Sequence, residues 1–191
     1  MKKTKYGVAL VATALVLSAC AGGGATDSSA SSDLRFVNVV KLTGVGWFDR
    51  MELGVDAFAA DTGIDATQTG ADDASPEKQV RIVEDLIAQG VNAITVVPNS
   101  PESLEGVFQK ARDAGIFIVT HEASAQKNTD ADIEAFDNTA YGATIMDNLA
   151  ECMGGEGEYV AFVGQVTAAS HMEWVAGALA QATAEYPGIV R

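Results

Sequence analysis

The amino-acid sequence predicts an α/β protein built on a doubly wound parallel sheet. Short segments rich in Val, Ile and Phe alternate with longer segments whose apolar residues recur at helical spacing. This alternation is typical of βαβ units, in which consecutive strands are parallel. The strand segments carry few polar residues, so helices are expected to cover both faces of the sheet. Right-handed crossovers between the strands then produce the doubly wound arrangement.

The expected strands and helices follow one another in the order that βαβ units require. Segments with the β-rich composition of strands cover residues 35–42, 66–70, 93–97, 116–120, 133–136 and 159–163. Segments with apolar residues on one helical face cover 49–60, 76–89, 104–111, 141–153 and 170–186. Ser75 and Pro76 are typical of a helix N-terminus, and Gly90 is typical of a helix end.

The beginning of the chain differs from the rest. Three early lysines precede a short apolar stretch at 6–17, which is the layout of a secretory signal and is too short for a spanning helix. The stretch runs into Leu-Ser-Ala-Cys20, which resembles a bacterial lipobox. We predict a lipoprotein signal peptide at 1–19, acylation of Cys20, and a flexible tether of small residues at 20–32. The alternative is a plain secretory signal followed by a chance cysteine.

The remaining residues divide into two unequal parts. Residues 33–140 contain the strands and helices of a complete N-terminal lobe. Residues 141–191 begin a second lobe, with one strand, two helices and the start of another strand at 187–190. Because so few strands do not make a stable sheet by themselves, we expect the chain to be a fragment of a longer protein. We also expect this fragment alone to bind its ligand poorly.

The charge, the hydropathy and the motifs of the sequence argue against several classes of function. With a formal charge of −14 over 191 residues, the chain lacks the clustered Lys and Arg that nucleic acid requires. No apolar run reaches the roughly 18 residues of a membrane-spanning helix. The sequence contains no HExxH, GxSxG or Walker-type motif, so we expect neither an enzyme nor a bound metal or cofactor. Cys152 falls in an apolar helical pattern and is expected to be a buried, inert thiol.

Candidate binding residues lie where strands end, because ligands of doubly wound sheets bind outside the carboxyl ends of the strands. The loop after the first strand contains Lys41, Trp47 and Phe48. An ammonium donor and flat aromatic faces are what a pocket uses to hold a sugar, although one of the two aromatic residues is expected to belong to the core. Gly44 and Gly46 suggest a dinucleotide fingerprint, but Asp49 replaces its third glycine and would repel a pyrophosphate.

Two further strand-exit loops contain candidates. Glu122 follows a buried strand and can accept two hydroxyl hydrogen bonds; the alternative is a solvated charge. Its neighbour His121 is as compatible with packing as with ligand contact. Ser170 is either a ligand-binding residue or a helix cap. Asn99 and Asn138 also lie in strand-exit loops, where turn formation is sufficient to explain them.

Taken together, these residues resemble a known family. The lipobox, the tether and the βα order over residues 33–191 resemble the periplasmic-binding-protein type I sugar receptors of bacterial ABC importers. The opening Lys41-Leu-Thr-Gly-Val-Gly-Trp47-Phe48 looks like that of the rhamnose-binding and autoinducer-2-binding subgroup. The segments Ala-Ile-Thr-Val-Val-Pro at 93–98 and Phe-Asp-Asn-Thr-Ala-Tyr-Gly at 136–142 match the wider family.

The resemblance implies a lipid-anchored, substrate-binding protein that captures a small sugar or related polyol and delivers it to an ABC permease. It implies an exported protein, held at the outer face of the cytoplasmic membrane or in the periplasm. Lys41 would bind ligand oxygens, Trp47 and Phe48 would line the ring, and Glu122 would take the place of the family's hydroxyl-binding aspartate. Ser170 and His171 stand where autoinducer-2 receptors carry an Asp-Gln pair.

The missing carboxylate at position 170 leaves the ligand open among autoinducer-2, a pentose, a deoxyhexose and another small polyol. The role is also open, because a receptor that feeds a signalling sensor can have the same fold.

Overall fold

Five parallel strands form the central sheet of the first lobe, in the order β2-β1-β3-β4-β5. The computed structural model describes residues 33–191. The strands of this sheet are β1 (Arg35–Val40), β2 (Asp65–Gly70), β3 (Ala93–Val96), β4 (Phe117–His121) and β5 (Ala131–Ile133). The helices that connect them are α1 (Gly46–Thr62), α2 (Pro76–Gln89) and α3 (Pro101–Asp113). The predicted α/β class with a parallel sheet is therefore confirmed.

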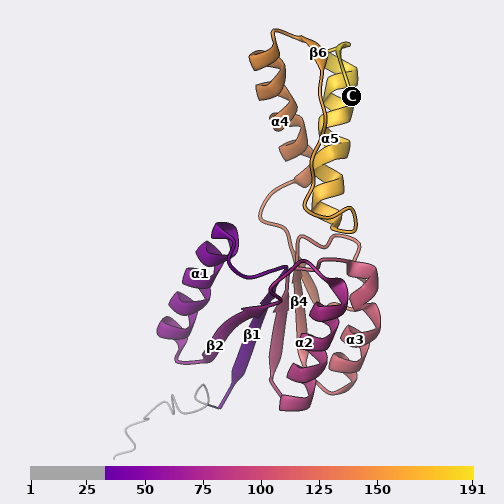
Figure 1. Ribbon diagram of the computed structural model, residues 1–191. Coiled ribbons are helices and arrows are strands. Elements are labelled where there is room, and N and C mark those ends of the chain that lie inside the picture. Colours follow the sequence, from indigo (N-terminus) through magenta and orange to yellow (C-terminus); the bar gives the residue numbers. More distant parts are fainter. Residues whose placement is uncertain (1–32) are drawn as a thin grey trace, which may run out of the picture.

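The helices of this lobe lie on both faces of the sheet. In Figure 1, α1 lies on one side of the strands, and α2 and α3 lie on the other. The main core is formed where α2 and α3 pack on the sheet, through Val83, Leu104 and Phe108 against Val39 and Ile118. The helix after β1 lies on one face of the sheet, and the helix after β3 lies on the other. The loops that leave these two neighbouring strands therefore diverge at the carboxyl edge of the sheet.

Both ends of α2 lie at the residues that the sequence predicts, because capping residues at each end set them. The Ser75 hydroxyl accepts a hydrogen bond from the Lys78 N–H, and Pro76 occupies the first turn, where a missing N–H costs nothing. Gly90 ends the helix in the left-handed conformation, with φ of 68°. The helices α1 and α3 each begin three residues earlier than expected, at Gly46 and Pro101. The first turn of α3 (Pro-Glu-Ser) is too polar to show in the apolar periodicity, and the first turn of α1 includes Trp47 and Phe48, which are expected in the loop after the first strand.

The second part of the chain lies beyond the carboxyl edge of the sheet (Figure 1). It consists of α4 (Asn138–Met153), β6 (Glu156–Glu158), α5 (Ala169–Glu185) and β7 (Gly188–Val190), with β6 and β7 paired in parallel. The two helices pack closely, because glycine occupies both contact points. A Cβ atom on Gly142 would lie 2.1 Å from the Trp174 carbonyl oxygen, and one on Gly177 would lie 2.1 Å from the Thr139 carbonyl oxygen.

The predicted strand at 159–163 is wrong. The strand of this region is β6, three residues earlier, and Val160 and Phe162 are 74% and 93% exposed. Residues 159–163 do not form a strand because they have no strand to pair with. The partner of β6 is β7, which ends at Val190 opposite Glu158, and no other strand among the described residues continues alongside 159–163. Apolar, β-rich residues do not form a strand without a second strand to accept their hydrogen bonds.

Two smaller expectations also need correction. The strand predicted at 133–136 is β5, which ends at Ile133 because it pairs with β4 only up to that residue, after which the chain leaves for α4. Cys152 is exposed rather than buried. The face of α4 that packs on its neighbours includes Met146 and Ala150, and a residue two positions after Ala150 points away from it.

The predicted signal peptide, the predicted acylation of Cys20 and the predicted tether all fall within residues 1–32, outside the described residues. Among the helices within 33–191, none has the length and apolar character needed to cross a membrane.

Candidate functional site

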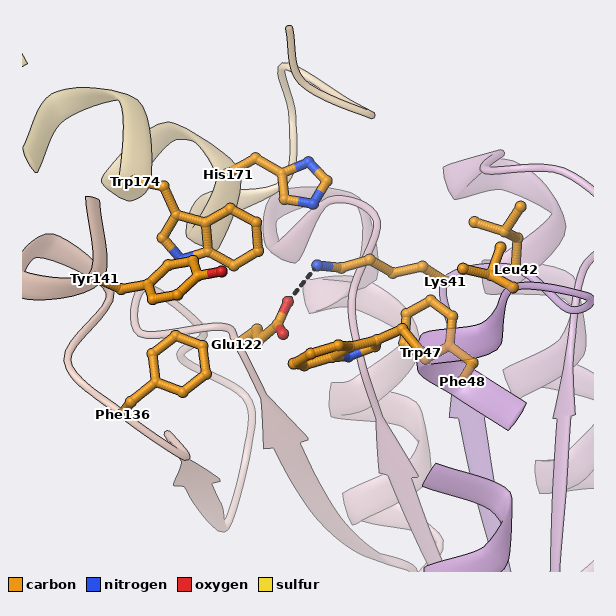
Figure 2. Close-up of a pocket in the computed structure, with 10 residues that line it drawn as sticks. Lys41, Leu42, Trp47, Phe48, Glu122, Phe136, Tyr141, His171 and Trp174 are labelled. Carbon is orange, nitrogen blue, oxygen red and sulfur yellow. Dashed lines mark hydrogen bonds and ion pairs between the residues drawn. The ribbon is translucent and has the colours of Figure 1, made fainter. Parts of the chain in front are cut away.

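A pocket of about 340 Å³ opens at the carboxyl edge of the sheet, between the first lobe and the α4–α5 pair (Figure 2). Its lining residues are Lys41, Leu42, Val45, Trp47, Phe48, Glu122, Phe136, Tyr141, His171 and Trp174. This is the edge at which the sequence predicts a binding site. Five of the six predicted ligand-binding residues line the pocket, and the sixth, Ser170, is hydrogen-bonded to two of them.

A buried ion pair lies at the centre of the pocket. The Lys41 Nζ is 2.6 Å from the Glu122 Oε2, and their side chains are 6% and 4% exposed. Lys41 directly follows β1 and Glu122 directly follows β4, the two strands that flank β3. Their long side chains therefore meet across the end of β3. The sequence predicts each residue as a binding group, but not that they pair with each other.

The backbone of Glu122 is unusual. Its φ is 57°, in the left-handed region that residues with a Cβ atom rarely adopt. Among the non-glycine residues from 33 to 191, Glu122 alone has a positive φ. Such a conformation costs about 1 kcal/mol and persists only where the surroundings enforce it, most often at functional sites.

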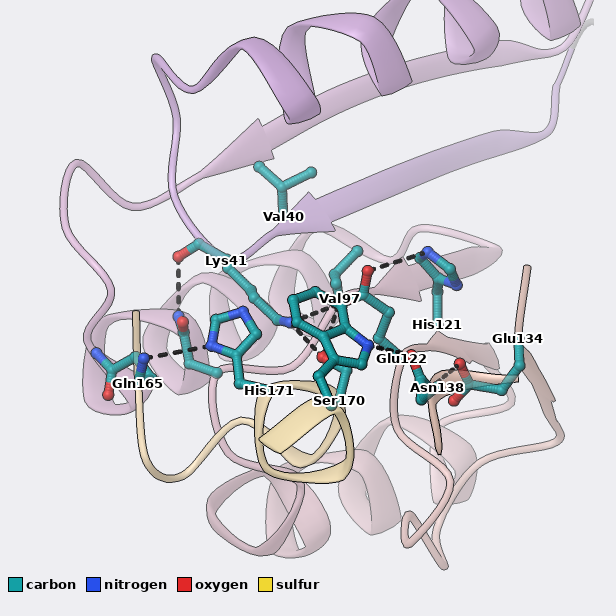
Figure 3. Close-up of polar contacts among 12 residues, drawn as sticks. Val40, Lys41, Val97, His121, Glu122, Glu134, Asn138, Gln165, Ser170 and His171 are labelled. Carbon is teal, nitrogen blue, oxygen red and sulfur yellow. Dashed lines mark hydrogen bonds and ion pairs between the residues drawn. The ribbon is translucent and has the colours of Figure 1, made fainter. Parts of the chain in front are cut away.

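Ser170 joins the ion pair from the second part of the chain. It lies in the first turn of α5 and is fully buried. Its hydroxyl lies 3.2 Å from the Lys41 Nζ, which donates to it, and it donates to the Glu122 Oε2 at 2.9 Å (Figure 3). The helix-cap alternative is excluded, because the N-cap position of α5 is Ala168.

The ion pair keeps unused hydrogen-bonding capacity. The Lys41 ammonium has three N–H donors, and Glu122 and Ser170 accept two of them. Within the described residues, the Glu122 Oε1 accepts no hydrogen bond, and the His121 Nε2 lies 3.7 Å from it. One N–H donor and one carboxylate oxygen therefore remain for a ligand.

The charges in the pocket balance. Burial acts to raise the pKa of Glu122, but the charge of Lys41 and the hydrogen bonds from Lys41 and Ser170 outweigh it and hold this pKa below its ordinary value. Burial and the charge of Lys41 lower the pKa of His171, so its imidazole is neutral at neutral pH. One cation, one anion and a neutral ring give the pocket no net charge.

Aromatic rings form two walls around the ion pair (Figure 2). On the first lobe, Trp47 is 55% exposed and faces the pocket, whereas Phe48 is buried against Val40 and Val97. The expectation that one of the two aromatic residues belongs to the core is therefore confirmed, and that residue is Phe48, although its ring also reaches the pocket.

The second wall comes from residues that the sequence does not identify. Phe136 and Tyr141 have ring centroids 5.0 Å apart, Tyr141 and Trp174 5.4 Å, and His171 and Trp174 5.0 Å. We call Phe136, Tyr141 and Trp174 the aromatic wall. Tyr141 and Trp174 lie on helices, where an aromatic residue at helical spacing looks the same whether it faces a core or a cavity.

Both histidines of the strand-exit loops are placed by polar contacts. His171 lines the pocket, and its Nδ1 accepts a hydrogen bond of 3.3 Å from the Gln165 N–H. His121 turns toward β5, with its Nδ1 2.6 Å from the Ile133 carbonyl oxygen, and does not line the pocket. Packing is therefore the better interpretation of His121.

Turn formation does not explain the two asparagines. Asn99 is fully buried, and its Nδ2 donates to the Lys41 carbonyl oxygen at 2.8 Å, which fixes the backbone of the lysine. The Asn138 side chain contacts Glu134 and Trp174, while the cap of α4 is Asp137. The signal for these roles is weak in the sequence, because an asparagine after a strand has the same appearance in a simple turn.

The comparisons with known proteins agree with this architecture. A family model described as "Periplasmic binding protein domain" matches residues 36–191. The xylitol-binding protein of Mycolicibacterium smegmatis is 30% identical over 178 residues, which cover 93% of this chain and 50% of that protein. This chain therefore spans about half the length of that relative.

Solved structures give the same result. A solute-binding protein of an ABC transporter from Burkholderia graminis, in complex with D-arabinose, has a TM-score of 0.75 and 27% identity, covering 84% of this chain and 56% of that one. A periplasmic solute-binding protein from Actinobacillus succinogenes with bound D-allose has a TM-score of 0.69 and 30% identity, covering 83% and 58%. With a family match over most of its length and this shared fold, the chain belongs to the periplasmic binding protein domain family.

Proposed function

We propose that this chain belongs to a substrate-binding protein that captures a small, neutral sugar or polyol for an ABC importer. The observation that carries the proposal is the buried Lys41–Glu122 pair, which has one donor and one acceptor to spare between two aromatic walls. The relatives support it, since one is a xylitol-binding protein and two are solute-binding proteins whose structures hold D-arabinose and D-allose. Binding would leave the ligand chemically unchanged.

The spare groups match two neighbouring hydroxyls. One hydroxyl would accept the free N–H of Lys41, and the other would donate to the Glu122 Oε1. The apolar C–H faces of the ligand would stack on Trp47 and on the aromatic wall. A charged ligand fits less well, because it would compete for one member of the pair and leave the other as a buried, unpaired charge.

The proposal specifies the class of ligand, and it does not specify one particular sugar. The resemblance of the Lys41–Phe48 segment to the rhamnose and autoinducer-2 subgroup supports a small ligand, such as a pentose, a deoxyhexose or another small polyol. Ser170 and His171 argue against autoinducer-2, because Ser170 is engaged with the ion pair and contributes no carboxylate. Export, acylation of Cys20 and delivery of the ligand to a membrane permease complete the proposal.

We expect Glu122→Gln to weaken sugar binding about 10- to 100-fold, because a hydrogen bond to a charged group contributes roughly 1.5–3 kcal/mol. Saturation-transfer difference NMR on the 191-residue chain, with xylitol, D-arabinose, D-allose and L-rhamnose, is suited to weak binding. Glu102→Gln is the matched control, because it makes the same change on an exposed residue of α3. No binding of any of these sugars, or equal binding by the Glu122 variant, would contradict the proposal.

We expect Cys20→Ser to move the protein from the membrane fraction to the soluble fraction of the cell envelope, because the substitution removes the sulfur that acylation requires. Fractionation of a bacterial host followed by immunoblotting measures this. Cys152→Ser, which changes the other cysteine of the chain, should leave the protein in the membrane fraction. Retention of the Cys20 variant in membranes would show that the lipid anchor is wrong.

A further inference from the structure

Asn138 is a buried polar residue beside the pocket that makes two side-chain hydrogen bonds in opposite directions. Its Oδ1 accepts the indole N–H of Trp174 at 2.7 Å. Its Nδ2 donates to the Glu134 Oε2 at 2.9 Å, a contact that Figure 3 shows. The residue is 6% exposed and does not line the pocket of Figure 2. A ligand in that pocket therefore meets the residues that Asn138 holds and not Asn138 itself.

The chemistry of the two partners requires an amide at this position. An indole N–H only donates, and the Glu134 Oε2 accepts at this contact, so the central side chain must offer an acceptor on one atom and a donor on the next. A carboxylate at 138 would face Glu134 with like charge, and an aliphatic residue would serve neither partner. Capping of α4 does not explain the residue, because the Asp137 side chain already accepts the Ala140 N–H at 2.9 Å.

The two hydrogen bonds tie together three parts of the chain. Glu134 follows β5 in the segment that leads from the sheet to α4, Asn138 begins α4, and Trp174 lies on α5. Among the described residues, Asn138 is the only hydrogen-bond partner of the Trp174 indole. The Trp174 ring in turn contacts the rings of Tyr141 and His171, which also line the pocket.

We propose that Asn138 is a positioning residue that fixes the Trp174 indole, and with it the aromatic wall, in the orientation that meets the ligand ring. Glu134 fixes the Asn138 amide in turn. The effect on ligand affinity rests on the proposed sugar-binding function, whereas the orientation of the indole does not.

The deciding experiment measures Trp174 without any ligand. The chain has two tryptophans, so Trp47→Phe leaves Trp174 as the sole indole emitter. In that background we expect Asn138→Leu to increase acrylamide quenching of the half-buried Trp174 and to shift its emission to longer wavelength, because the ring loses its anchor. Asn138→Ala, which cannot clash, tests the same point if the leucine variant does not fold.

Two control variants separate positioning from general destabilisation. Glu134→Gln keeps an oxygen that accepts from Asn138 and should retain the parent quenching. Asn148→Leu makes the same substitution on an exposed residue of α4 whose amide bonds only to the Thr144 carbonyl oxygen, and it should also leave Trp174 unchanged. A lower melting temperature with unchanged quenching and emission, in a folded Asn138 variant, would overturn the proposal.

A second readout connects the residue to binding. With Trp47 retained, Asn138→Ala should weaken binding of xylitol or D-arabinose about fivefold, the equivalent of one net hydrogen bond. Unchanged affinity in the variant would overturn the positioning role toward the ligand. If the parent protein binds no sugar, the proposed function fails, while the quenching experiment still decides whether Asn138 orients Trp174.

Discussion

Lys41→Met is expected to lower the free energy of unfolding by about 3 kcal/mol at neutral pH. The substitution keeps most of the side-chain volume but leaves Glu122 as a buried charge without its partner, which is among the most destabilising changes a single substitution can make. Ser170 would still donate one hydrogen bond to the carboxylate, but this does not replace an ammonium 2.6 Å away. Chemical denaturation followed by circular dichroism measures the difference.

The pH dependence of this difference identifies its cause. In the parent protein the pKa of Glu122 is depressed, so its contribution is present above the unfolded value of about 4.3 and is lost as the pH falls through the folded pKa. Without Lys41, burial raises that pKa, and protonation then removes the unpaired charge. We therefore expect the stability gap between the two proteins to narrow as the pH falls from 7 toward 4.

A double variant serves as the control. Lys41→Met combined with Glu122→Gln removes both charges and leaves a side chain that can still accept from Ser170. Because replacing both members of a buried pair is often close to neutral, the double variant should recover most of the lost stability while binding no sugar. A Lys41→Met protein as stable as the parent at pH 7 would contradict the importance of the pair.

Gly142→Ala is expected to destabilise the α4–α5 pair by about 3 kcal/mol, at the upper end of the usual cost of overpacking. The added Cβ would lie 2.1 Å from the Trp174 carbonyl oxygen, which belongs to the backbone of α5 and has no side-chain freedom with which to move. The helices must therefore separate, and this displaces Trp174 and Tyr141 from the pocket. Thermal unfolding and near-ultraviolet circular dichroism measure the two effects.

Gly106→Ala is the matched control for that substitution. Gly106 lies within α3, and a Cβ there would meet nothing within 4 Å. Alanine should stabilise this helix by up to about 1 kcal/mol, because it has the higher helix propensity. Gly177→Ala should behave like Gly142→Ala, since its Cβ would lie 2.1 Å from the Thr139 carbonyl oxygen. Equal stability of the Gly142 and Gly106 variants would show that the close approach of α4 and α5 is unimportant.

The parts of this protein that the sequence predicts well depend on local chemistry. The ends of α2 follow from Ser75, Pro76 and Gly90, each of which acts on its own neighbours. Lys41 and Glu122 are identifiable as candidates because each directly follows an apolar strand. Their pairing is not identifiable, because it requires the strand order in which β3 lies between β1 and β4.

The parts that the sequence does not predict depend on contacts between distant segments. Trp174 enters the pocket only because α5 packs against α4 through two glycines, and helical spacing alone does not reveal which side the ring faces. Residues 159–163 fail as a strand for the same kind of reason, because a strand needs a partner that local composition does not supply. Asn138 is misread as a turn residue because its two partners lie at 134 and 174.

The left-handed backbone of Glu122 also limits how the pocket can be redesigned. At a φ of 57°, β-branched residues are strongly disfavoured, whereas glycine, asparagine and aspartate are the most comfortable replacements. Aspartate would ease the backbone but, being one methylene shorter, would have to reach farther toward Lys41. A library of variants at position 122 should therefore be limited to glycine, asparagine, aspartate and glutamine. Changes in ligand preference should instead be sought by varying Trp47 and Tyr141, which line the pocket and whose backbones impose no such restriction.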